Sequence, residues 1–341
     1  MNARQTPSAH VARRTSSRTL SALAATVGAL HLLGWGLFFY FASRAGNLAY
    51  AGAGTLAYTL GLRHAFDADH ISAIDDSVRL LVQRGKRPLS VGLYFSLGHA
   101  TVVFALSLAV AFGAQLIGDR VALLRAVGSV VGASVSGGFL YLVAGLNAAV
   151  LYQLVRTPQG TGAPTGLMSR IFGQRLRLIR AERQLYWVGL LFGLGFDTAS
   201  EIGLLGLTAS AATHRGLPPA AILALPLIFA AGMSLFDTAD GVFMVRAYAW
   251  AQHEPVRKRR YNVATTALSV AVAFGVGTVE LLGVLVHALN ARGGWVTLLD
   301  ALANRFELLG LGIVVLFGAI WLTAALVLKR QARAPPLSSA A

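Results

Sequence analysis

Long hydrophobic segments alternate with short polar ones along the whole chain. A helix needs ~20 mostly apolar residues to cross the hydrocarbon core of a bilayer, and eight segments reach that length. They cover residues 20–42, 50–76, 89–113, 126–152, 186–210, 219–249, 262–290 and 306–328. Several are longer than a straight span requires, so we expect tilt or kinks. The pattern predicts an all-α polytopic membrane protein with about eight transmembrane helices.

The composition excludes the main soluble classes. Of the 341 residues, 55% are hydrophobic and 13% are charged, against ~25% charged residues in an ordinary soluble domain. A soluble fold could not bury so much apolar surface, and a disordered chain would be far more polar. The chain contains no cysteine, which excludes disulfides, iron–sulfur clusters and thiolate metal sites.

Basic residues indicate how the helices are oriented. The formal net charge is +15, and 22 of the 29 Lys and Arg residues fall before the first span, between alternate pairs of spans and after the last span. Positive residues near membrane spans remain in the cytoplasm, so both termini are predicted to be cytoplasmic. The positive charge is therefore a topology signal, and it does not indicate a nucleic-acid partner.

Polar stretches divide the chain into two halves. Residues 1–19 form a basic tail that we expect to be disordered, and residues 20–153 form a first half with four helices. A basic cytoplasmic loop, residues 154–185, leads to a second half with four helices at 186–328, and residues 329–341 form a second tail. The first span lacks an obvious cleavage site, so we interpret it as an anchor and not as a signal peptide.

Acidic residues occur mainly inside the predicted spans. Charged groups are costly within a bilayer and usually have a function there, yet eight of the 14 acids lie well within spans. They are Asp67, Asp69, Asp75, Asp197, Glu201, Asp237, Asp240 and Glu280. A single such acid could simply hydrogen-bond between helices, but eight in four spans predict a polar interior that attracts cations.

The densest polar cluster is the segment from Arg63 to His70 in the second span. On a regular helix, His64, Asp67 and His70 fall on one face within an arc of about 120°. Imidazole and carboxylate groups are good ligands for divalent first-row metals, so we predict a metal site of His64, Asp67, Asp69 and His70. Asp69 lies off this face, which predicts a supporting role and a milder effect of Asp69→Asn than of Asp67→Asn. Arg63 is placed to pair with Asp67, four residues on.

Other polar residues in the spans predict a path for an ion. Two carboxylates lie four residues apart in the fifth span and two lie three residues apart in the sixth, while the third and seventh spans each contribute one polar residue. We assign to this transport pathway His99, Asp197, Glu201, Asp237, Asp240 and Glu280.

Together these segments resemble the nickel/cobalt transporter family. The hallmark of that family, His-x4-Asp-His in the second span, is matched by His64, Asp69 and His70. Its other signatures are similar to the segments 94–101, 194–201, 231–241 and 277–281, with Ala100 and Ser200 as mild departures. The resemblance implies a single-chain permease that takes up Ni²⁺ or Co²⁺ across a bacterial inner membrane. Its partners would be the ion as substrate and the lipid bilayer, with no tightly bound cofactor.

Three alternative functions stay open at this point. An efflux permease is the nearest, but related exporters often carry a His-rich cytoplasmic segment, and residues 155–185 contain no histidine, which favours uptake. A membrane metalloenzyme would need more grouped histidines, and a haem protein would not need so many intramembrane acids. No Gly-x4-Gly-Lys-Ser/Thr motif is present, so we expect a secondary transporter and not an enzyme.

Overall fold

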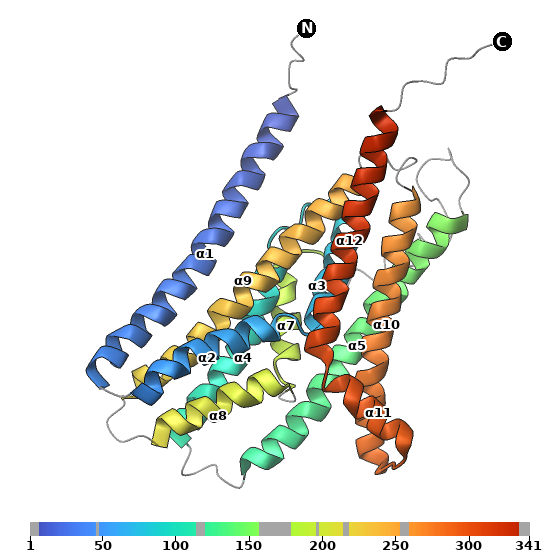
Figure 1. Ribbon diagram of the computed structural model, residues 1–341. Helices are drawn as coiled ribbons and strands as arrows, with labels where there is room; N and C mark the ends of the chain where they lie inside the picture. The colour runs from blue at the N-terminus through green and yellow to red at the C-terminus, as the bar shows by residue number, and fades with distance from the viewer. Residues whose placement is uncertain are drawn as a thin grey trace, which may run out of the picture.

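The computed structural model describes residues 7–45, 48–113, 120–156, 179–195, 198–213, 218–252 and 259–333. These ranges are helical apart from short turns and contain no strand. The helices pack side by side as an elongated bundle (Figure 1). The N-terminal end of α1 and the C-terminal end of α12 lie at the same end of the bundle.

Within these described ranges, six helices are long and apolar enough to cross a membrane. They are α1 (Pro7–Ala45), α4 (Val91–Gly113), α5 (Arg120–Arg156), α9 (Pro219–Gln252), α10 (Arg259–Leu289) and α12 (Phe306–Arg333). The prediction of an all-α polytopic membrane protein is therefore confirmed. α1 begins at Pro7 and so includes residues 7–19, which we predicted as a disordered tail. The count of eight crossings and the cytoplasmic side of the termini stay predictions.

Two predicted spans are each built from a pair of shorter helices. The segment 50–76 forms α2 (Leu48–His64) and α3 (Ala68–Gln83), and the segment 186–210 forms α7 (Leu185–Phe192) and α8 (Ala199–Thr213). The expectation of one regular helix over 50–76 is thus wrong. Interrupted helices are tolerated at membrane depth where the freed backbone is enclosed by protein. We call the segments 65–67 and 193–198 the first and second breaks.

The remaining elements are short. A 3₁₀ turn, η1 (Glu182–Gln184), precedes α7, and α11 (Gly294–Ala303) lies between α10 and α12. The hydropathy pattern did not predict α11.

Helix α3 lies at the centre of the bundle. Of its 16 residues, 14 are buried, and it packs against α5, α9, α10 and α12. Helix α9 packs against α1, α2, α3 and α4. Arg79, which the charge pattern placed in a loop, lies in α3 and is buried. Most polar side chains of α3 and several of α9, such as Asp237 and Asp240, are therefore enclosed by protein.

Candidate metal centre

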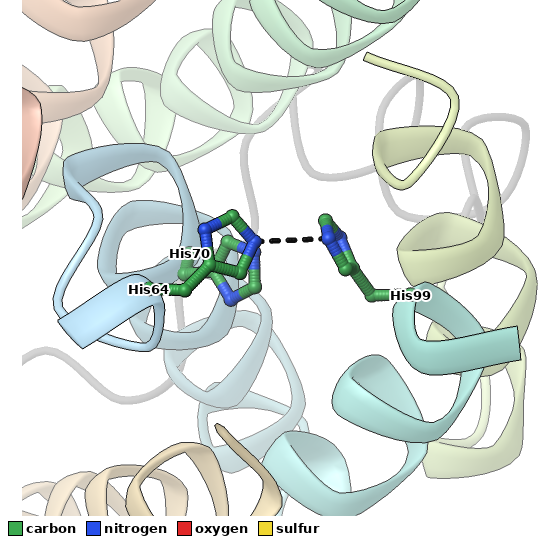
Figure 2. A group of neighbouring side chains, drawn as sticks. All are labelled: His64, His70 and His99. Atoms are coloured by element: carbon green, nitrogen blue, oxygen red, sulfur yellow. Dashed lines mark hydrogen bonds between the residues drawn. The ribbon is translucent and has the colours of Figure 1, made fainter. Parts of the chain in front are cut away.

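Three histidines from three helices meet inside the bundle (Figure 2). His64 is the last residue of α2, His70 lies in the first turn of α3 and His99 lies in α4. Their ring centroids are 4.6 Å apart for His64 and His70, 4.8 Å for His64 and His99, and 4.7 Å for His70 and His99. Their candidate ligand nitrogens all lie within 4.8 Å of one another, and all three side chains are buried. We call this group the histidine cluster.

The first break brings His64 and His70 together. On a continuous helix six residues correspond to ~9 Å along the axis, too far for direct ring contact. Instead α2 ends in a turn in which the N–H of Asp67 donates to the carbonyl of His64 at 2.9 Å. Asp67 then adopts an extended conformation and α3 begins at Ala68. The predicted pairing of the two histidines is present, but a shared helical face does not produce it.

The second break places a carboxylate next to the histidine cluster. Glu201 lies in the first turn of α8, and its Oε1 is 3.0 Å from Nε2 of His99 and 3.9 Å from Nε2 of His64. The hydroxyl of Thr198 donates to the Glu201 carboxylate at 3.0 Å and accepts the backbone N–H of Glu201 at 3.3 Å. Because these bonds fix the side chain at the start of α8, Glu201 is held facing the imidazoles.

The two aspartates of the predicted site occupy different positions. Asp67 is the buried residue that precedes α3. Asp69 accepts the backbone N–H of His70 at 2.7 Å and lines a small cavity together with His64 and His99. Asp69, which the helical wheel placed off the face shared by His64, Asp67 and His70, therefore lies beside the histidines.

The cavity measures about 20 Å³ and is also lined by Glu201, Thr198 and Glu280. On α10, Glu280 accepts hydrogen bonds from the Ser136 hydroxyl at 2.7 Å to each carboxylate oxygen. A cavity needs ~10–15 Å³ to hold one water molecule. This cavity therefore has room for one water-sized particle among carboxylate and imidazole groups.

His70 turns its ring towards α9, where Nδ1 lies 3.4 Å from Oδ2 of Asp237. Both side chains are fully buried. Within the described residues, both ring nitrogens of His70 and both carboxylate oxygens of Asp237 and Asp240 have no hydrogen-bond partner. Buried polar atoms are usually satisfied, so these atoms could accept a cation.

The charge balance of the interior also favours a cation. Among the described residues, six carboxyl groups are buried, on Asp67, Asp75, Asp76, Glu201, Asp237 and Asp240, against a single buried Lys or Arg, which is Arg79. Asp197, assigned to the pathway from sequence, lies outside the described residues.

Sequence reasoning did not identify Glu307 at the start of α12. Glu307 forms an ion pair with Arg63 at the end of α2 and accepts the Ser200 hydroxyl at 2.5 Å. Arg63 had been expected to pair with Asp67. The only signal for Glu307 was its position as an acid at the boundary of the last predicted span.

The donor set matches the chemistry of late first-row divalent ions. Imidazoles with a carboxylate suit Ni²⁺, Co²⁺, Zn²⁺ and Cu²⁺, whereas Mg²⁺ and Ca²⁺ prefer sites made of oxygen alone.

Comparison with known proteins gives a consistent result. The family profile described as "High-affinity nickel-transport protein" (NicO) matches residues 50–327. The chain is 42% identical to the cobalt transport protein NhlF of Rhodococcus rhodochrous, over 92% of this chain and 93% of that protein. It is 44% identical to the nickel transporter NicT of Mycobacterium tuberculosis, over 90% of this chain and 88% of that protein. No solved structure matches the chain.

Proposed function

Because the chain belongs to the high-affinity nickel-transport family, we propose that it is a secondary transporter that takes up Ni²⁺ or Co²⁺ across a bacterial inner membrane. The observation that carries the proposal is the buried histidine cluster with Glu201 beside it, at the point where two interrupted helices meet. Relatives whose names describe nickel or cobalt transport support the choice of ion.

In this proposal His64, His70, His99 and Glu201 bind the transported ion. Three neutral imidazoles and one carboxylate select for late first-row metals. Thr198 positions Glu201 through its hydrogen bond, as outer partners commonly orient metal ligands. The two unsatisfied nitrogens of His70 are available to the ion without the loss of an existing hydrogen bond.

In this proposal the remaining acids line the transport pathway of the ion on either side of the histidine cluster. Asp69 and Glu280 line the cavity, whereas Asp237 and Asp240 lie beyond His70 on α9. Asp197 belongs to the same path by its position in the sequence motif. Transporters with interrupted helices often bind ions at the interruptions and alternate access around them, and both breaks border the proposed site.

The membrane potential can supply the energy for uptake. Moving one charge across 100 mV is worth ~2.3 kcal/mol, so a divalent ion gains roughly 4.6 kcal/mol. No ATP-binding loop is present in the sequence, and we expect neither ATP hydrolysis nor another catalytic activity.

Flux measurements in proteoliposomes test the proposal. With a potassium-diffusion potential that is negative inside, wild-type protein should accumulate ⁶³Ni²⁺ or ⁵⁷Co²⁺ without a reductant or an organic substrate. His99→Ala should abolish this flux. His31→Ala is the matched control, because His31 bonds only to Val27 and Tyr58 in the hydrogen bonds assigned to it and should retain the wild-type rate. Flux that is absent in wild type would contradict transport, and flux in cells directed only outward would favour efflux.

A further inference from the structure

The interface between α3 and α9 carries polar side chains well beyond the histidine cluster. His70 faces Asp237, Asp240 has Asp75 as its charged neighbour, and Arg79 bonds to Tyr248. The contacts follow increasing residue number on both helices, so α3 and α9 run in the same direction here. A row of charged groups therefore leads away from the histidine cluster along one interface.

The part of this row nearest to the histidines has carboxylates that accept no hydrogen bond in the described residues, although Nδ1 of His70 lies 3.4 Å from Oδ2 of Asp237. Both oxygens of Asp237 and both oxygens of Asp240 have no hydrogen-bond partner among the described residues, although the side chains are 0% and 9% exposed. Asp237 and Asp240 are neighbouring charges, three residues apart on α9. Burying carboxylates without partners is costly, and a bound cation would remove that cost.

The carboxylates further along the row are already engaged. The Ser269 hydroxyl lies 2.5 Å from Oδ2 of Asp75 and 2.6 Å from Oδ1 of Asp76. The Asn147 amide donates to Oδ1 of Asp76 at 2.7 Å, and Tyr248 donates to Asp75. These hydrogen bonds connect α3 to α5, α9 and α10. We therefore interpret Asp75 and Asp76 as residues that hold the helices together and not as a binding site for the ion.

Arg79 closes the row at its far end. Its guanidinium donates to the Thr266 hydroxyl at 2.7 Å, to the Tyr248 hydroxyl at 2.5 Å and to the carbonyl of Thr265 at 2.9 Å. It also lies 4.1 Å from the centroid of the Tyr248 ring. A divalent ion moving along the interface would meet this fixed positive charge.

We propose that Asp237 and Asp240 form a second binding station for the divalent ion, made of oxygen ligands, and that Arg79 is the barrier at its far end. This inference rests on the proposed transport function. Carboxylates bind Ni²⁺ and Co²⁺ less well than imidazoles do, so an ion leaving the histidines would pass to a weaker site from which it can be released. Arg79 must move away from Tyr248 and Thr266 before the ion leaves.

Equilibrium binding of ⁵⁷Co²⁺ to the full chain in lipid nanodiscs tests the station. Wild-type protein should show one tight and one weaker class of site. Asp240→Asn should lose only the weaker class and His99→Ala only the tight one. Thr238→Val, a buried neighbour on α9, is the matched control and should retain both.

A single tight class in wild type, or an unchanged weaker class in Asp240→Asn, would overturn the station. Absence of the tight class in wild type would instead contradict the proposed function, so the two failures are distinguishable.

Thiol labelling tests the barrier, since the chain has no cysteine of its own. Ser269→Cys places a single thiol beside Asp75 and Asp76. A membrane-impermeant methanethiosulfonate should leave this thiol unlabelled when Arg79 is present, and should label it at least about tenfold faster, from one side of the membrane, after Arg79→Gln. Arg79→Lys, which retains the charge, should restore protection.

Melting temperatures identify any variant that has lost its fold, and Arg79→Ala replaces Arg79→Gln in that case. If the thiol of Ser269→Cys is labelled at the same rate with and without Arg79, whether the labelling is fast or absent in both, Arg79 is not the barrier.

Discussion

The two interrupted spans meet at one site but contribute to it differently. The first break is a turn of three residues with proposed ligands on both sides, His64 before it and His70 after it. The second break is longer and contributes from one side in the described residues, through Thr198 and Glu201. α3, which follows the first break, is buried over 14 of its 16 residues, whereas α8 has exposed residues at 202, 206 and 210. We infer that the part of the site on α3 is held more firmly than the part on α8.

The largest expected effect comes from removing ligands at the first break. His64→Ala or His70→Ala should lower the initial rate of ⁵⁷Co²⁺ uptake by more than ~100-fold, because each removes one of the three imidazoles. Glu201→Gln retains an oxygen and should lower the rate by only ~10–100-fold. Immunoblots of membranes control for abundance. Equal, complete loss in all three variants would show that both breaks contribute equally.

The next largest difference in uptake is expected between variants of Asp67 and Asp69, the two aspartates beside the first break. Asp69 lines the cavity with His64 and His99, so Asp69→Asn should reduce uptake by about tenfold or more, and Asp67→Asn should have the smaller effect. This order reverses the one expected from a regular helix. The order is measured as the ratio of the two uptake rates in the same vesicle preparation. A larger loss in Asp67→Asn would favour the interpretation that His64, Asp67 and His70 share the face that binds the ion.

Glycines pack against both breaks and allow a comparison of their rigidity. A Cβ at Gly310 would collide with the carbonyl of Phe66 in the first break, and a Cβ at Gly132 would collide with the backbone of Gly195 in the second. Gly310→Ala should destabilise the protein by ~1–3 kcal/mol, visible as a lower melting temperature. Gly132→Ala should cost less, because α8, which follows the second break, is less buried than α3.

Each glycine variant has a control on its own helix. Gly312 on α12 and Gly138 on α5 have open space where a Cβ would lie, so alanine at either should leave the melting temperature near the wild-type value. A larger destabilisation by Gly132→Ala than by Gly310→Ala would contradict the inference that the part of the site on α3 is held more firmly.

The smallest effect is expected where the two breaks are joined. Glu307 bridges Arg63, before the first break, and Ser200, after the second. Because the Arg63 side chain is 53% exposed, the ion pair should be weak, and Glu307→Gln should lower uptake by only about two- to fivefold. Ser200→Ala removes only the hydrogen bond between Ser200 and Glu307, so it tests this contact separately from the ion pair. An unchanged rate in both variants would show that the breaks move independently.

The sequence predicted the helical membrane fold and the proximity of His64 and His70 in its interior, because hydropathy and buried charge are local signals. It did not predict the first break, since no Gly or Pro occurs between His64 and His70. The polar residues of this segment were interpreted as functional groups on a regular helix, so they did not indicate an interruption. A helical wheel applied across it placed Asp69 on the wrong face.

Contacts between distant segments could not be predicted from periodicity. His99 and Glu201 are separated by 102 positions, and Arg63 and Glu307 by 244. Nothing in the local pattern of α4, α8 or α12 indicates which residue on another helix each will meet. The sequence motifs identified the participants, and only the packing shows which of them converge.

The size of the cavity has a consequence for selectivity. By the measure in which one water molecule needs ~10–15 Å³, the six waters of a hydration shell need about 60–90 Å³, more than the cavity of about 20 Å³. An ion bound there must shed nearly its whole shell and replace it with imidazole and carboxylate groups. Mg²⁺ gives up its water reluctantly, so this abundant cellular cation would be rejected at the cost of dehydration, before ligand preference is tested at all.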